Sequence, residues 1–177
     1  LRHSNRKMKL GSLKNGTRDG ALCMVSRDLK FGLVAYDVAP TLQSALDDWD
    51  YSFPRLEELY DGLNRNPGSG RSFEIDFAQF HAPLPRAFYR ASGTAYASCV
   101  ERARRTRGAN FQKEANAEPV MHQAASDAFI GPRDQITVES DEWGIDLEGE
   151  VGVITGDVPS SGALGASRRL PRARTPA

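Results

Sequence analysis

Apolar and polar residues follow clear local patterns over the first third of the chain. Short runs with strand-like composition cover 8–13, 21–25 and 31–34. Between them lie the turn signals Asn15-Gly16, Asp19-Gly20 and Arg27-Asp28. The pattern predicts three short strands joined by tight turns.

Helical spacing follows these strands. Thr41 is suited to cap a first helix, whose apolar face would consist of Leu42, Ala45, Leu46 and Trp49. A second helix is predicted to begin at Pro54, with Ser52 as its cap, and to end in the loop 64–70. A further strand is predicted over 72–77. The first third therefore reads as a small α+β unit, and its helix residues are expected to form a core.

Strict alternation returns between Trp143 and Thr155, where another strand is predicted. Successive side chains of a strand point to opposite faces, so apolar residues line one face and Asp146, Glu148 and Glu150 the other. Like charges repel, so this stripe is either a solvated sheet face or a site for a hard divalent cation. The pattern by itself leaves both readings open.

Charge is distributed unevenly. The chain holds 23 basic and 23 acidic residues, but 1–7 contribute three basic residues and the tail after Pro159 four, with no acid in either. The remainder has 16 basic against 23 acidic residues, a net charge of −7. An acidic body suits a cytoplasmic protein that attracts cations and argues against nucleic acid as a partner.

The remaining composition bounds the class of protein. A hydrophobic content of 40% is enough for a core. Cys23 and Cys99 lack metal-ligand spacing and are interpreted as free thiols of a reducing compartment. No stretch is long enough to span a membrane, so no membrane partner is expected. Residues 1–7 are interpreted as an upstream extension, and the Arg-, Pro- and Ala-rich segment 159–177 as a disordered tail arising from a frameshift or truncated reading frame.

A resemblance to a known protein family favours the metal-site interpretation of the acidic stripe. Six landmarks carry it, in order along the chain: 8–20, 25–29, 39–49, 82–86, 126–133 and 142–151. From Met8 to about Pro159 the chain resembles the N-terminal half of a bacterial protein of the fumarylacetoacetate hydrolase family. The implied fold is α+β and β-rich. A small N-terminal α+β domain would cover 8–80, and the truncated first part of a rolled, mixed β-sandwich catalytic domain 81–158.

The resemblance also implies a chemistry. Family members are hydrolases that use Mg or Ca to cleave a carbon-carbon bond in a small dicarbonyl acid, such as fumarylacetoacetate in tyrosine breakdown. Relatives also include decarboxylases, hydratases and acylpyruvate hydrolases, and the half present here does not choose among them. A homodimer is the assembly considered.

Carried over residue by residue, Glu148 and Glu150 match the family's Glu-x-Glu metal ligands, whereas Asp146 does not. Two other positions depart from the family. Ser92 occupies the place of an Asp ligand, and Cys99 occupies the place of the His that acts as general base. A hydroxyl is a poor ligand for a hard dication, and a thiol with a reference pKa of about 8.5 is a poor base at neutral pH.

Two further residues, Arg107 and His122, have two interpretations each. Arg107 matches an arginine near the substrate carboxylate, but Arg102, Arg104, Arg105 and Arg107 also suit a solvated loop or helix face. His122 stands where relatives have a substrate-facing Tyr, and is either a replacement base or an ordinary hydrogen-bonding residue. The expected outcome is a family hydrolase fragment without a retained catalytic residue and with weak or absent cation binding. The alternative is a non-catalytic interaction or dimerisation protein.

Overall fold

The computed structural model describes residues 7–87, 90–93, 96, 98, 101–102, 105, 121–124, 128–147, 149–155 and 173–174. Its chain divides into two units, Leu1–Asp134 and Gln135–Ala177, which are treated separately below.

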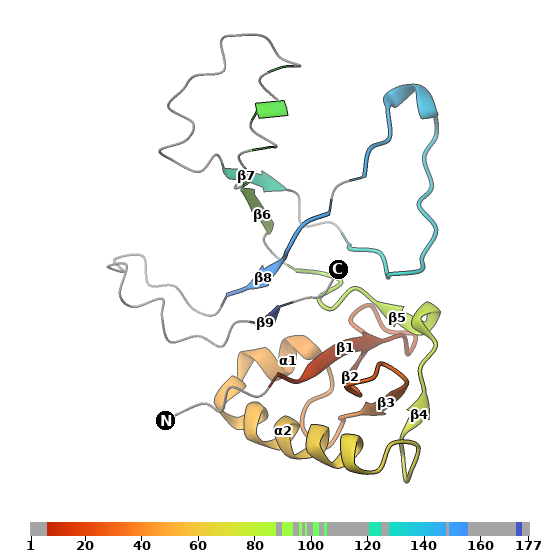
Figure 1. Ribbon diagram of the computed structural model, residues 1–177, viewed down its shortest axis with the longest axis vertical. Coiled ribbons are helices and arrows are strands. Elements are labelled where there is room, and N and C mark those ends of the chain that lie inside the picture. The colour runs from red at the N-terminus through yellow and green to blue at the C-terminus, as the bar shows by residue number, and fades with distance from the viewer. Residues whose placement is uncertain are drawn as a thin grey trace, which may run out of the picture. The chain divides into compact units, whose positions relative to one another are not determined.

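Five short strands form an antiparallel sheet in the first unit (Figure 1). They are β1 (Lys9–Leu13), β2 (Ala21–Val25), β3 (Phe31–Val34), β4 (Phe73–Glu74) and β5 (Phe80–His81), in the order β4-β3-β2-β1-β5. The three N-terminal strands confirm the sequence prediction. The turn between β1 and β2 places Gly16 and Gly20 at φ 84° and 69°, a region that favours glycine.

The central strand β2 is buried on both faces, which explains its unbroken apolar run. Leu22 and Met24 face the helices and belong to the larger core cluster. Cys23 and Val25 face the opposite way and pack against Phe80 in a second cluster. Alternate residues of one strand thus enter two separate cores.

Two helices cover one face of this sheet (Figure 1). Helix α1 (Leu42–Asp47) is capped as predicted, because the Thr41 hydroxyl accepts a hydrogen bond from the Ser44 amide at 3.1 Å. Helix α2 (Trp49–Arg65) carries Leu56, Tyr60 and Leu63 on its buried side.

The predicted start of the second helix was wrong. Helix α2 begins at Trp49, with Asp48 as its N-cap, and Pro54 lies inside the helix. Proline was expected at the first helical position because it has no amide hydrogen. Here a turn of helix precedes Pro54, and in that turn the rings of Trp49 and Phe53 lie 5.5 Å apart and Phe53 is buried. Such packing favours the earlier start.

The predicted strand over 72–77 is shorter than expected. Strand β4 covers only Phe73–Glu74, and a 3₁₀ turn, η1 (Phe77–Gln79), follows with Asp76 as its N-cap. The Asp76 carboxylate accepts a hydrogen bond from the Ala78 amide at 3.0 Å. This side-chain bond favours a turn over continued extension.

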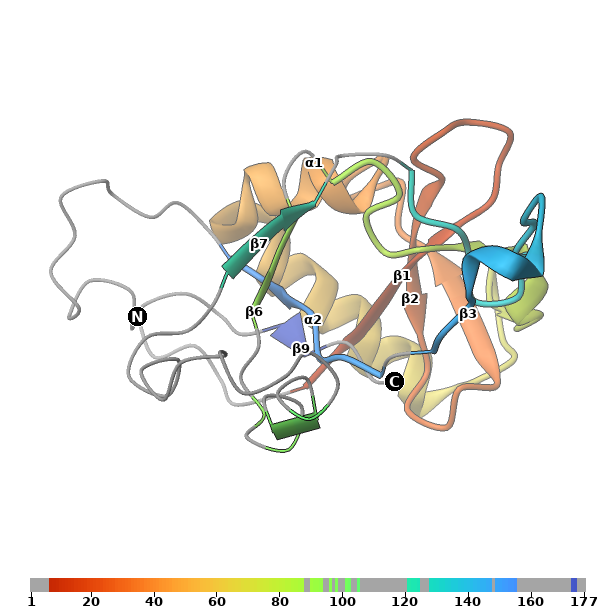
Figure 2. The ribbon, with the colours of Figure 1, turned by 90° about the horizontal axis from the view of Figure 1, so that it is seen from above.

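Two further strand pairs lie later in the chain. Strands β6 (Arg90–Gly93) and β7 (Met121–Ala124) pair antiparallel and run side by side in Figure 2. In the second unit, β8 (Val153–Ile154) pairs with β9 (Ala173–Arg174). Residues 173–174 are the part of the predicted disordered tail that the structure describes, and disorder of the tail as a whole stays a prediction.

The long strand expected over 143–155 is not formed by the described residues of that segment. Only Val153–Ile154 are in a strand, Asp141–Trp143 form a 3₁₀ turn (η3), and Gly144 has φ 74°, which is not extended. A strand is held by hydrogen bonds to a neighbouring strand, and among the described residues of this segment only those of β8 have such a neighbour. The apolar side chains of this segment are exposed, Leu147 at 90%.

The fold is therefore mixed α+β and strand-rich, with a curled antiparallel sheet and few helices among the described residues. Among these residues no helix combines the length and the apolar character that crossing a bilayer requires.

Candidate functional site

The acidic stripe that motivated the metal hypothesis is only partly within the described residues. Glu150 is exposed, whereas Glu148 lies outside the described residues. Asp146 is exposed, and its carboxylate accepts a hydrogen bond from the Leu147 amide at 2.8 Å. Asp146 thus forms a local hydrogen bond, and its exclusion from the ligand set stays a prediction.

The β6–β7 pair brings together two residues singled out from the sequence. Ser92 lies directly opposite His122 in the antiparallel register, so their α-carbons are about 4.5–5.5 Å apart by the geometry of such pairs. Ser92 is half-buried and His122 is exposed. The position predicted to match an Asp ligand of the family thus lies opposite a histidine in the strand pair.

The other predicted site residues are Cys99 and Arg107, and both lie outside the described residues. Cys23, the other thiol, is fully buried in the sheet. Burial raises the pKa of Cys23 to about 12, so this thiol stays protonated at neutral pH. Cys23 is a core residue and not a nucleophile.

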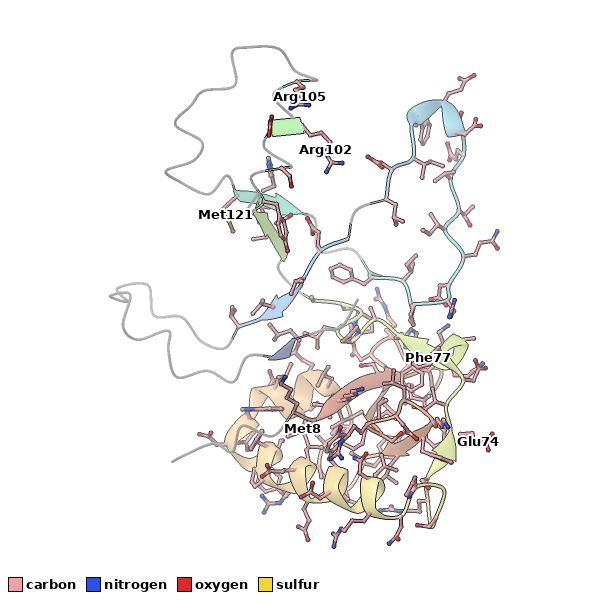
Figure 3. All side chains as sticks on the ribbon, viewed as in Figure 1. Met8, Glu74, Phe77, Arg102, Arg105 and Met121 are labelled. Atoms are coloured by element: carbon pink, nitrogen blue, oxygen red, sulfur yellow. The ribbon has the colours of Figure 1, made fainter. Side chains whose placement is uncertain are left out.

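Two arginines near Arg107 lie on the surface, as the solvated reading expects. Arg102 and Arg105 are both exposed (Figure 3), and Arg105 donates a hydrogen bond to Glu101 at 2.6 Å. Such i,i+4 pairs stabilise local structure only slightly because they are exposed to solvent. The role predicted for Arg107 itself is untested.

An ion pair in the first unit was not anticipated from the sequence. Arg86 donates two hydrogen bonds to the Asp19 carboxylate, one of them from Nε at 2.8 Å. These bonds hold the pKa of Asp19 below its ordinary value. The pair borders a small cavity of about 240 Å³, which is lined by Asp19, Thr41, Leu42, Gln43, Pro83, Leu84, Pro85 and Arg86. Arg86 could have been singled out in the sequence because it ends Pro-Leu-Pro-Arg, one of the segments that carry the family resemblance.

The described residues do not by themselves supply a ligand set for a hard dication. They contain no group of three His, Cys, Asp or Glu side chains placed to hold a metal ion. Glu150 supplies one carboxylate, and a neutral hydroxyl such as that of Ser92 is a poor ligand for a hard dication.

Comparison with known families accounts for most of the chain. The family model described as fumarylacetoacetase N-terminal domain 2 matches residues 8–86. A second, described as fumarylacetoacetate (FAA) hydrolase C-terminal, matches residues 89–167. The chain belongs to the fumarylacetoacetate hydrolase family. No curated protein matches it.

The matches confirm the family but not the details of the domains. The second match extends beyond 158, into the segment predicted to be a disordered tail. The boundaries at 80 and 158, the upstream extension and the origin of the tail stay predictions. Family membership suggests a hydrolase-type function, and members of the family generally depend on divalent metal.

Proposed function

We propose that this chain derives from a metal-dependent hydrolase that cleaves a carbon-carbon bond in a small dicarbonyl acid, and that the chain does not turn over such a substrate. The supporting observation is Ser92. It occupies the position of a carboxylate ligand in the family and lies opposite His122, so the β6–β7 pair offers a hydroxyl where the reaction needs a carboxylate.

The proposed loss of activity has two chemical causes. A neutral hydroxyl binds a hard dication far more weakly than a carboxylate does. A cysteine at position 99, where the family has its general base, is mostly protonated at neutral pH if its pKa lies near the reference value of about 8.5. Such a thiol does not accept a proton from water efficiently.

Glu148 and Glu150 are the residues proposed to keep a role. Two carboxylates at this spacing attract Mg or Ca weakly without the third carboxylate. His122 receives no catalytic role in the proposal, because its side chain is exposed to solvent. A homodimer and a cytoplasmic location complete the proposal, and no observation favours the alternative of a non-catalytic interaction protein.

A turnover assay tests this proposal directly. The chain is mixed with fumarylacetoacetate and Mg, and the loss of dicarbonyl absorbance is followed against a blank. We expect no rate above the blank. A rate that exceeds the blank and falls when Glu148 and Glu150 are both changed to Ala would refute the proposed inactivity.

Two further measurements sharpen this test. Calorimetric titration with Mg and with Ca is expected to show weak binding or none, and a tight site would contradict the proposal. The double variant Ser92→Asp, Cys99→His restores the family's residues at both altered positions. Its control is Ser98→Asp, which adds a carboxylate at a neighbouring exposed serine, and only the double variant is expected to bind the cation more tightly.

A further inference from the structure

Residues 128–134 return to the N-terminal sheet although they belong to the region matched by the hydrolase domain. The first contact is a backbone hydrogen bond, in which the Phe129 amide donates to the Pro85 carbonyl at 2.8 Å. Pro85 is itself buried, and its neighbour Leu84 packs against the larger core cluster. The contact therefore rests on a part of the N-terminal domain that is held in place.

The second contact depends on the absence of a side chain. Gly131 is buried, and a β-carbon built on it would lie 2.2 Å from the carbonyl oxygen of Phe80 in β5. That distance is far below any real contact, and backbone atoms do not move aside as a flexible side chain does. Glycine at 131 is thus what allows the segment to approach the backbone of β5.

The third contact is an ion pair supported on both sides. Lys14 Nζ lies 2.6 Å from one carboxylate oxygen of Asp134, and the Gly131 amide donates to the other at 2.7 Å. Lys14 Nζ also donates to the Ala78 carbonyl at 2.8 Å, and the Lys14 amide donates to the Gln79 carbonyl at 2.7 Å. Both partners of the pair are therefore oriented by further hydrogen bonds.

These contacts differ from an ordinary surface ion pair. The Lys14 and Asp134 side chains are 29% and 31% exposed, whereas those of the pair Arg71–Asp37 in the same domain are 69% and 67% exposed. Partial burial and extra hydrogen bonds reduce screening by solvent, which is the main reason why exposed pairs contribute little. The Lys14–Asp134 pair is thus better suited than an exposed pair to hold two segments of the chain together.

We infer that the N-terminal domain carries a docking site for a Gly-x-x-Asp segment of its own chain, in which Lys14 is the positioning residue that recognises Asp134. The site joins the region matched by the N-terminal family model to the region matched by the hydrolase model. It goes beyond the proposed function and does not rest on it. Its role is to hold residues 128–134 against the N-terminal sheet.

Amide hydrogen exchange of the full chain, read by mass spectrometry, tests the docking site without any cation or substrate. In the unaltered chain the amides of Phe129 and Gly131 are expected to exchange slowly. Lys14→Met, which keeps the aliphatic stem and removes the charge, is expected to accelerate them about tenfold, while Leu22 and Met24 in β2 keep their protection. Gly131→Ala is expected to accelerate the same amides through a steric cause alone.

Two control variants separate recognition from a general loss of stability. Arg71→Met removes the exposed pair in the same domain and is expected to leave exchange at Phe129 and Gly131 unchanged. Lys14→Arg keeps a cation and is expected to restore most of the protection that Lys14→Met removes.

Three results would overturn the inference. They are unprotected Phe129 and Gly131 amides in the unaltered chain, equal protection in Lys14→Met and Arg71→Met, and an equal loss of protection in β2 when Lys14 is changed. The last result would make Lys14 a general stability residue. Because none of these readouts involves cation binding or turnover, failure of the docking site and failure of the proposed function are distinguishable.

Discussion

The N-terminal residues 7–87 and the later segment 135–155 carry similarly regular patterns but reach opposite outcomes. In the first region Leu22, Met24 and Leu56 are 0% exposed. In the second, Trp143 is 73% and Leu147 90% exposed. Figure 3 shows dense side chains within the first region and separate ones along the second.

A strand-like apolar pattern therefore becomes a strand only where a neighbouring strand is available. Strand β2 has β1 on one side and β3 on the other, and its residues enter cores on both faces. Among the described residues of 143–155, only Val153 and Ile154 have a strand partner. Without hydrogen-bonded neighbours, an apolar stripe has nothing to bury itself against.

A matched pair of leucine truncations is expected to show the largest difference between the two regions. Leu56→Ala removes a fully buried side chain of α2, and we expect it to lower the free energy of unfolding by about 2–5 kcal/mol. Leu147→Ala is expected to change it by less than about 0.5 kcal/mol, because the side chain is already in water. Urea denaturation followed by circular dichroism measures both. Comparable losses from the two variants would show that Leu147 is buried in solution.

A pair of glycine substitutions gives the next largest effect. Gly20 has φ 69°, and a β-carbon there would lie 2.6 Å from the Leu13 carbonyl oxygen. Gly149 has no neighbouring atom within 4 Å of such a β-carbon. We expect Gly20→Ala to lower the free energy of unfolding by about 1–3 kcal/mol, from backbone strain together with the close contact. Gly149→Ala should be close to neutral in the same denaturation experiment, and an equal cost at both positions would contradict the comparison.

The smallest expected effect is a dependence of stability on pH in the first unit. Hydrogen bonds from Arg86, the Ser26 hydroxyl and Lys14 hold the pKa values of Asp19, Asp28 and Asp134, respectively, below the ordinary value of 3.8. A lowered carboxyl pKa contributes stability that is present above 3.8 and is lost as the pH falls through the folded-state pKa.

Denaturation midpoints measured from pH 7 to pH 3 check this sign. We expect the denaturation midpoint to decrease as the pH drops below about 4. Asp19→Asn should lower the midpoint at pH 7 and make its decrease on acidification smaller. A midpoint that rises on acidification, or an Asp19→Asn variant with the full pH dependence of the unaltered chain, would contradict the prediction.

Local signals were enough for the N-terminal sheet. Strands β2 and β3 and the Thr41 cap agree with the prediction, because tight turns and side-chain caps are set by residues close in sequence. The start of α2 was missed because the prediction relied on a local signal, Pro54. The helix begins one turn earlier, where Trp49 packs against Phe53.

The candidate site divides in a similar way. The family could be identified from the order of motifs along the chain, and that assignment is confirmed. The departures at Ser92 and Cys99 stay predictions. The strand register that places Ser92 opposite His122 could not be predicted from the sequence, because residues thirty positions apart give no local signal that they pair. The pair of Lys14 and Asp134, 120 residues apart, was missed for the same reason.

The amino-acid sequence alone was enough for the family, the strands of the N-terminal sheet and the helix cap. Only the tertiary structure decided which patterns are realised. It buried the run 21–25 on both faces, left Leu147 in solvent, and brought Gly131 against the backbone of β5. The physical reason is that propensities and turns act over a few residues, whereas burial, strand pairing and ion pairs depend on partners far away in the chain.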